Sequence, residues 1–185
     1  SALVIENQFG LLVWLSLPQW LEFLIALIFL DLFAQYTIHY LLHKTPLLWR
    51  FHKVHHSDTM VDATTGTRHH PVDYLVRELF SLTMVILLGL PPEFYAIYRV
   101  ITIGCTYFTH ANIELPDWLD RSVSQVLVSP NAHKFHHHHE VPWTDSNFGN
   151  IFVFWDKIFG TYVYQSTKDI VFGVDTMDPS KANSL

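Results

Sequence analysis

Three long apolar segments lie between about residue 20 and residue 108, separated by short polar stretches. The first runs from about Trp20 to Leu42, which is long enough to cross a bilayer, since a crossing takes about 20 helical residues. The second runs from Tyr74 to Leu90 and the third from Phe94 to about Phe108, with the turn signal Gly89-Leu-Pro-Pro92 between them. The pattern predicts a membrane-spanning helix, which Pro18 begins, followed by a helical hairpin that dips into or crosses the membrane.

Polar side chains interrupt the first apolar segment at regular intervals. They are Asp31, Gln35, His39 and His43. A four-residue spacing places them in one stripe along the helix, and ionisable groups at membrane depth are costly and usually functional. A helix end that merely emerges into water would explain His43 but not Asp31. The stripe therefore predicts a functional site, with Asp31 in a supporting role.

The composition also indicates a membrane protein. Only 15% of the 185 residues are charged and the mean hydropathy is +0.20, whereas soluble domains carry about 25% charged residues. The length predicts a single domain. The sequence has no basic run or arginine patch interleaved with aromatic residues, which excludes nucleic acid as a partner. Cys105 is the only cysteine, so any metal must be bound by histidine or carboxylate side chains.

The distribution of basic residues predicts the orientation. A hairpin returns the chain to the side that it left, so polar segments before and after the hairpin face one compartment. Basic residues gather beside the first of these segments, at Lys44, Arg50, Lys53, Arg68 and Arg77, and the turn from Gly89 to Glu93 has none. By the positive-inside rule this segment faces the cytoplasm. We expect an integral protein of a bacterial inner membrane or the endoplasmic reticulum.

Histidines are the most informative residues of the chain, which has 13 of them. One motif occurs twice, as His52-Lys-Val-His55-His56 and as His133-Lys-Phe-His136-His137. On a helix the first and last histidine of this motif share one face, with the middle one beside them. His39 and His43 add an i,i+4 pair, and His70 and His110 are further candidates. A closed structural zinc site needs only about four ligands, so this set suffices for two metal ions.

Ligand spacing leaves the metal and the chemistry open, because imidazole suits iron as well as zinc. A histidine-rich site for two metals at a membrane surface fits O2 activation on a lipid C–H bond. A membrane metal transporter or storage protein would also need many histidines, but along a path through the bilayer. A zinc-dependent lipid hydrolase would keep the site and work without O2 or a reductant.

Taken together, several motifs resemble the fatty acid hydroxylase/sterol desaturase superfamily, in order and spacing, over roughly residues 20–165. They are His39-Tyr-Leu-Leu-His43, Leu48-Trp-Arg-Phe-His52-Lys-Val-His55-His56-Ser57, Arg68-His-His70-Pro71, Thr109-His110-Ala-Asn112, Pro130-Asn-Ala-His133-Lys-Phe-His136-His137, Asn147-Phe-Gly149 and Trp155-Asp-Lys-Ile-Phe-Gly160-Thr-Tyr162. The resemblance implies one domain over residues 1–185, with a polar tail over about 166–185. Its fold would be an all-α bundle of three to four hydrophobic membrane helices with a cytoplasmic cap that holds two metals.

The resemblance also implies the activity, a membrane-bound, O2-dependent hydroxylase or desaturase of a sterol, fatty acyl or ether lipid. Its cofactors would be two iron ions, which zinc can replace in a purified sample, and its electrons would come from an external donor of cytochrome b5 or ferredoxin type. The implied ligands are His39, His43, His52, His55, His56, His70, His110, His133, His136 and His137. Supporting roles around the metals are expected for Asp31, Asn112, Asn147 and Asp156.

The chain departs from the superfamily pattern at a few positions. His138 and His139 follow the second motif, where a small polar residue is usual, and we expect them to be exposed to solvent. Asp73 stands where a glutamate is common. His69 directly precedes His70, so the sequence leaves open which of the two approaches the metals.

Overall fold

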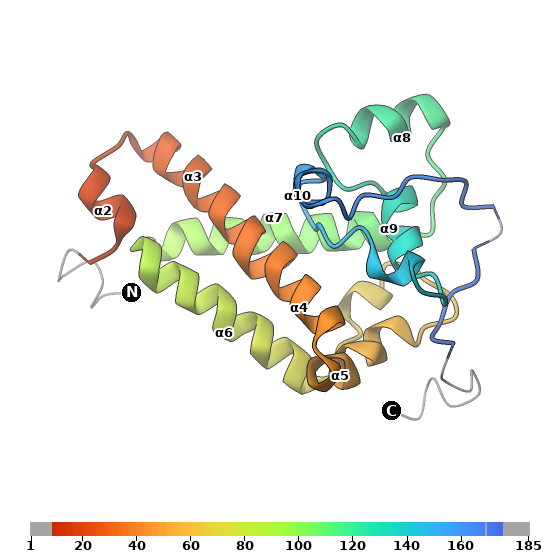
Figure 1. The fold of residues 1–185 in the computed structure, drawn as a ribbon. Coiled ribbons are helices and arrows are strands. Elements are labelled where there is room, and N and C mark those ends of the chain that lie inside the picture. The colour runs from red at the N-terminus through yellow and green to blue at the C-terminus, as the bar shows by residue number, and fades with distance from the viewer. Residues whose placement is uncertain (1–8, 169, 176–185) are drawn as a thin grey trace.

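The computed structural model of the chain describes residues 9–168 and 170–175. Helices joined by loops build these residues, which contain no β-structure beyond isolated bridges, in agreement with the predicted all-α class (Figure 1). The predicted polar tail lies partly outside the described residues, which end at residue 175. Its first part runs beside the second histidine motif, because His139 N–H donates to the Val171 carbonyl at 2.9 Å.

A single long helix forms the first apolar segment. It consists of α3 (Gln19–Asp31), a π-helical stretch (Leu32–Thr37) and α4 (Ile38–Lys44). Pro18 directly precedes it, as predicted. It is the one helix in the described part of the chain that is long and apolar enough to cross a membrane.

The π-helical stretch lies between the two halves of the polar stripe. Four residues exceed one α-helical turn, so a stripe with this spacing drifts around an ordinary helix. The wider turn of a π-helix reverses part of that drift. Asp31 before the stretch and His39 after it are both buried, at 0% and 6% exposure, and both contact the segment that precedes α10. The local change in helix type therefore keeps the stripe directed at one region.

The predicted hairpin is formed by α6 (Pro71–Leu88) and α7 (Pro92–His110). Gly89 ends α6 with φ at +74°, a left-handed conformation that glycine adopts without penalty. The short helix α2 (Leu11–Leu15) packs against this turn. A Cβ built on Gly89 would lie 2.5 Å from the Phe9 carbonyl oxygen, so a larger residue would separate the two segments.

The apolar core lies where α3, α6 and α7 pack together. Its buried members include Leu30, Ala34, Val85, Leu88, Phe94 and Tyr98. Tyr98 is fully buried, and its hydroxyl accepts a hydrogen bond from the Gln35 amide at 3.0 Å. Figure 1 shows α4 and the first turns of α6 converging beside α5 (Pro46–His56), so the core supports the helix ends that carry the histidines.

The outer faces of α6 and α7 expose large apolar side chains. They include Leu75, Leu79, Leu82 and Ile86 on α6 and Ile97, Val100, Ile103 and Tyr107 on α7, with Val100 72% exposed. Contiguous apolar surfaces of this kind mark protein or membrane contacts. By length and composition, α6 and α7 do not qualify as membrane spans, so their crossing of the membrane stays a prediction.

The remaining elements cover the converging helix ends. They are the 3-10 turn Thr65–Thr67, α8 (Asp117–Val123), α9 (Pro130–His136), the 3-10 turn Trp143–Asp145 and α10 (Phe154–Phe159). Helix α9 begins at Pro130, and the Ser129 hydroxyl caps it by accepting from the Ala132 N–H at 3.2 Å. This capping fixes the position of the second histidine motif.

Candidate metal centre

Nine histidines form two adjacent groups at the converging ends of the helices. The five-histidine group comprises His39, His43, His52, His56 and His136, and the four-histidine group comprises His55, His110, His133 and His137. Within each group the candidate ligand nitrogens all lie within 4.8 Å of one another, and all nine residues are buried. The groups adjoin, because the ring of His56 lies 4.6 Å from the rings of both His136 and His137.

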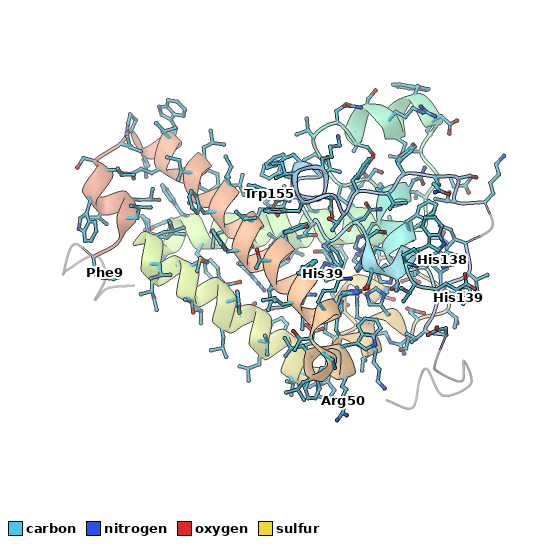
Figure 2. All side chains as sticks on the ribbon, in the orientation of Figure 1. Phe9, His39, Arg50, His138, His139 and Trp155 are labelled. Carbon is cyan, nitrogen blue, oxygen red and sulfur yellow. The ribbon has the colours of Figure 1, made fainter. Side chains whose placement is uncertain are left out.

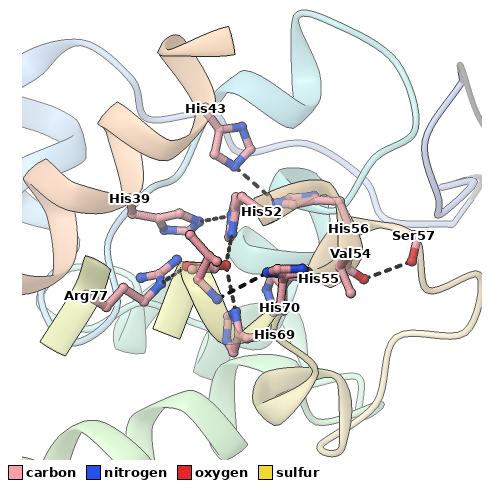
Figure 3. A network of polar contacts seen from close by, with 12 residues as sticks. His39, His43, His52, Val54, His55, His56, Ser57, His69, His70 and Arg77 are labelled. Atoms are coloured by element: carbon pink, nitrogen blue, oxygen red, sulfur yellow. Dashed lines mark hydrogen bonds and ion pairs between the residues drawn. The ribbon is translucent and has the colours of Figure 1, made fainter. Parts of the chain in front are cut away.

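The two copies of the histidine motif divide between the groups in opposite ways. On α5, His52 and His56 join the five-histidine group while the middle residue, His55, joins the other. On α9, the first and last histidines join the four-histidine group, and the middle one, His136, joins the five-histidine group. Each motif therefore contributes to both groups. The α4 pair and the end of α7 complete them, and Figure 3 shows His39 and His43 pointing from α4 toward His52 and His56.

Hydrogen bonds determine the tautomers of four rings of the five-histidine group. The Nδ1–H of His39 donates to the Phe148 carbonyl at 2.9 Å, and that of His136 donates to the Ser146 carbonyl at 2.7 Å. Carboxylates accept the other two Nδ1–H bonds, from His52 to Asp73 at 2.8 Å and from His43 to Asp145 at 3.2 Å. A neutral imidazole carries one N–H, so the Nε2 atoms of these four rings are lone-pair acceptors.

These lone pairs face one another without a proton between them. The Nε2 atoms of His39 and His52 are 3.1 Å apart, and Nε2 of His136 is buried with no hydrogen-bond partner. Two acceptors at this distance repel unless a cation lies between them. Ligand nitrogens about 2.1 Å from one metal ion and at right angles would be about 3.0 Å apart. The five-histidine group therefore fits a metal ion.

The four-histidine group converges on one nitrogen. His110 donates its Nδ1–H to the Thr106 carbonyl at 2.8 Å, which leaves Nε2 as an acceptor. The Nε2 atoms of three rings lie 3.1–3.2 Å from this atom, those of His55, His133 and His137. One lone pair cannot accept three short N–H bonds, whereas four nitrogens around a metal ion would have such spacings. This group therefore fits a second metal ion.

Burial keeps these rings neutral. It lowers the pKa of all six histidines of the two motifs well below the usual value, and neighbouring rings lower it further. At neutral pH the rings are therefore not protonated, and no proton separates the converging lone pairs. Neutral imidazole is the form that binds metals.

A loop before α10 supplies the carbonyls that orient His39 and His136. Asp156 accepts hydrogen bonds from the N–H groups of Phe148 and Gly149 at 2.8 and 2.9 Å, and burial raises the pKa of its carboxyl to about 6. Asp31 accepts from the N–H groups of residues 151 and 152 and from the Trp155 indole. Two carboxylates that do not touch the histidine nitrogens thus fix the loop from both ends.

Asn147 lies within the same loop. Its side chain donates to the carbonyls of Ala132 and Val163 and accepts from the Val163 N–H, each at 2.7–2.8 Å. It adopts a φ of +51°, which asparagine tolerates better than most residues. These contacts tie the loop to α9, where the second motif begins.

Sequence reasoning missed two carboxylates that contact the histidines directly. Asp73 accepts from His52, from His69 at 3.0 Å and from Arg77 at 2.9 Å. Asp145 accepts from His43 and from Lys44, and these hydrogen bonds hold the pKa of its carboxyl below the usual value. Asp73 stood out only as a replacement for glutamate, although its position four residues after His69 at a helix start signals such a contact.

The structure does not bring every predicted site residue to the two groups. His70 lies outside both, because its Nδ1 caps α6 by accepting from the Val72 N–H at 3.1 Å. Its neighbour His69 instead stacks on His55, with ring centroids 4.5 Å apart. Asn112 is exposed on the loop after α7. His138 and His139 are partly exposed and also lie outside the groups, at the end of the molecule opposite Phe9 (Figure 2).

A cavity of about 310 Å³ adjoins the histidines. Four members of the two groups line it, His39, His55, His110 and His133. From there it extends along α6 and α7 past Thr102, Ile103 and Thr106 to Tyr74, Glu78 and Arg99. A volume near 300 Å³ is at the lower end of the range for ligand sites. The cavity thus connects the candidate metal centre with the faces of the hairpin.

Over the described residues, the fold and the site define a helical protein with one membrane-length helix and a buried histidine centre able to hold two metal ions. The family model described as fatty acid hydroxylase matches residues 23–161, a range that includes all nine grouped histidines. The chain therefore belongs to the fatty acid hydroxylase family, within the fatty acid hydroxylase/sterol desaturase superfamily. No solved structure matches the chain significantly.

Curated relatives are named as monooxygenases or hydroxylases. Alkylglycerol monooxygenase of Homo sapiens is 26% identical over 153 residues, which cover 80% of this chain and 33% of that protein. Ornithine lipid hydroxylase OlsE of Rhizobium tropici is 28% identical over 130 residues, 70% of this chain and 38% of the relative. Cholesterol 25-hydroxylase of Rattus norvegicus is 30% identical over 141 residues, 75% of this chain and 45% of the relative. The chain thus spans about a third to under half of their length.

Proposed function

We propose that this chain is the core of a membrane lipid hydroxylase, a monooxygenase-type oxidoreductase with two iron ions and O2 as co-substrate. Family membership and the names of the relatives support an enzyme that hydroxylates lipids. The observation that carries the proposal is the convergence of buried Nε2 atoms in two adjacent groups, at spacings of 3.1–3.2 Å that N–H donors cannot satisfy and that metal ions would.

In this proposal the five-histidine group holds one iron ion and the four-histidine group holds the other. When bound, the pair of ions supplies the redox chemistry that inserts one oxygen atom of O2 into a lipid C–H bond. The second oxygen atom leaves as water, which consumes protons and electrons from an external donor of cytochrome b5 or ferredoxin type. Hydroxylation is favoured over desaturation because the relatives are named hydroxylases and monooxygenases.

The side chains of the protein have separate tasks in this activity. The Nδ1–H bonds to carbonyls and carboxylates keep Nε2 of His39, His43, His52 and His136 directed inward. Asp31, Asn147 and Asp156 act through the loop before α10, whose carbonyls accept two of those bonds. The cavity brings the lipid to the histidines, and the packed rings exclude bulk water from the reacting carbon.

We place α3–α4, α6 and α7 in the bilayer. The exposed apolar faces of α6 and α7 support this placement, because such surfaces are costly in water. Lys44, Arg50 and Lys53 lie at the histidine end of the helices and the opposite turn, Gly89–Glu93, has no basic residue, so we assign the metal centre to the cytoplasmic side of a bacterial inner membrane or the endoplasmic reticulum.

Isotope-labelled O2 tests the function. Iron-reconstituted protein in mild detergent is incubated with a reducing system and a panel of sterols, fatty acyl lipids and ether lipids, and products are analysed by mass spectrometry. We expect a hydroxylated product that carries the label and is absent with His136→Ala. Turnover that continues without O2 or reductant would instead identify a zinc-type hydrolase, and metal flux without lipid oxidation would identify a transporter.

A further inference from the structure

Helix α10 packs against the membrane-length helix well before the end of its apolar segment. The Trp155 indole donates to Asp31 at 2.9 Å, and the Phe159 ring stacks on Tyr36 with centroids 5.2 Å apart. Asp31 and Tyr36 lie 11 and 6 residues before Leu42, which corresponds to about 16 and 9 Å along a helix. These contacts place α10 beside the part of the long helix that we assign to the bilayer.

The outer surface of α10 and of the segment beside it is apolar. The Lys157 ammonium donates to the carbonyls of residues 124 and 125 at 2.8 and 3.3 Å, and the Val153 N–H donates to the Val126 carbonyl at 3.0 Å. Residues 124–127 therefore run beside α10. The two segments expose large apolar side chains at 39–65%, which we call the α10 patch: Val126, Leu127, Ile158 and Phe159. Such a surface marks contact with protein or membrane.

A band of basic and aromatic side chains adjoins the α10 patch. Its members, Arg121, Lys157, Tyr162 and Tyr164, line one cavity of about 230 Å³. Arg121 lies over the Tyr164 ring, 5.9 Å from its centroid, and Lys157 lies over the Tyr162 ring at 5.3 Å. Tyrosine rings gather at the headgroup level of a bilayer, where basic side chains meet anionic lipids. Interfaces between proteins are instead depleted in lysine. This band therefore favours a lipid surface over a protein partner.

From these observations we infer that the α10 patch lies in the bilayer interface on the side of the metal centre. Ile158 and Phe159 then enter the acyl chains, while Arg121 and Lys157 lie among the headgroups. The inference rests on the bilayer placement of α3–α4 in the proposed function, but not on the metals or the oxidation. A segment that follows both histidine motifs in the chain thus returns to the membrane.

This contact connects the bilayer with the metal centre. The loop before α10 supplies the carbonyls of Phe148 and Ser146, which accept from His39 and His136. Asp156, on α10 itself, accepts from two N–H groups of that loop. With the α10 patch in lipid, the loop is held between the long helix and the bilayer. The membrane then helps to position two residues of the five-histidine group.

Fluorophore quenching in proteoliposomes tests the inference without turnover. The chain carries Cys105→Ala and one new cysteine at a time, by Ile158→Cys, Leu24→Cys or Met60→Cys, and each is labelled with the fluorophore NBD. The vesicles contain phosphatidylcholine and phosphatidylglycerol. A doxyl-labelled phosphatidylcholine quenches from the lipid, and iodide quenches from the water. Leu24 is exposed on α3 and serves as the lipid control, whereas Met60 follows α5, is 76% exposed and serves as the water control.

The label at position 158 should behave like the lipid control. We expect doxyl lipid to quench it at least about half as strongly as at position 24, and iodide to quench it at least about fivefold less than at position 60, because an interfacial helix buries its apolar face about 5–10 Å deep. If Ile158→Cys lowers the helical circular dichroism, Val126→Cys decides instead, with the same expectations.

Two results would overturn the inference. Iodide quenching at position 158 as strong as at position 60 would place the α10 patch in water. Protection of position 158 from both quenchers would show that a second copy or another protein segment covers the patch. If the label at position 24 also fails to reach lipid, the bilayer placement in the proposed function is wrong as well. Failure to oxidise any lipid would contradict the proposed reaction alone and leave the quenching result intact.

Discussion

Asp156→Asn is expected to weaken one metal site and spare the other. The carboxylate of Asp156 accepts with separate oxygens, Oδ1 from the Phe148 N–H and the Thr161 hydroxyl, and Oδ2 from the Gly149 N–H. An asparagine amide has only one oxygen, so its NH2 group must face one of these donors. A buried N–H then loses its partner, which costs about 1–3 kcal/mol.

The displaced loop carries the effect to the histidines. The Phe148 carbonyl accepts from His39 and the Ser146 carbonyl accepts from His136, both in the five-histidine group. Loss of such an orienting bond lowers metal affinity by about 10- to 100-fold. In the four-histidine group, His110 is oriented by Thr106 of its own helix, so this group should keep its affinity.

The assay is metal retention against graded chelator, measured by mass spectrometry on protein in mild detergent. We expect the variant to release one ion at about 10- to 100-fold lower chelator concentration and the second ion as in the parent. Asp120→Asn is the matched control, because Asp120 is an equally buried carboxylate that accepts from Tyr164, away from the histidines. Release of both ions together, or of neither, would refute the coupling through the loop.

Three further predictions follow from burial, helix capping and backbone conformation. The metal-free protein should lose stability as pH falls below about 6.5, because burial lowers the folded-state pKa of the six motif histidines and the unfolded chain therefore takes up more protons. Each such proton changes the free energy of unfolding by about 1.4 kcal/mol per pH unit. The measurement is the thermal midpoint between pH 8 and 5, and a flat profile would contradict the prediction. His70→Ala should cost about 1 kcal/mol of stability through the lost cap of α6 and leave the metal content unchanged, whereas loss of an ion would make His70 a ligand. Gly89→Ala should destabilise the protein by more than about 1 kcal/mol, because Gly89 has a positive φ and contacts Phe9. Gly104→Ala should stabilise it by about 0.5–1 kcal/mol, because a Cβ at this position of α7 meets open space. Equal effects of the two substitutions on thermal unfolding would refute the argument.

The elements that follow from local pattern could be predicted from the sequence. Long apolar runs, Pro18 and the Gly89 turn define the first helix and the hairpin to within a few residues. The polar stripe predicts that Asp31 and His39 face one region, and they do. Whether these helices lie in a bilayer depends on what surrounds them, and neither the spacing of apolar residues nor the length of a helix determines that.

The division of the histidines between two groups could not be predicted from the sequence. Spacing within a motif gives the face of a helix but not the neighbouring helix that this face meets. The separation of His55 from His52 and His56 therefore depends on tertiary packing. The choice between His69 and His70 depends on the residue at which α6 begins, since His70 precedes its first turn and becomes the cap. The role of Asp145 depends on a contact with a residue about 100 positions earlier in the chain, which no local pattern reports.

The central claim is that two metal ions bind in separate but adjacent histidine groups. The most direct test is the number of iron ions per chain after anaerobic reconstitution, measured by mass spectrometry for the parent, His136→Ala and His110→Ala. We predict about two ions in the parent and about one in each variant, with a different ion lost in each case. A folded parent that binds no metal, or a single ion that either variant abolishes, would contradict the account.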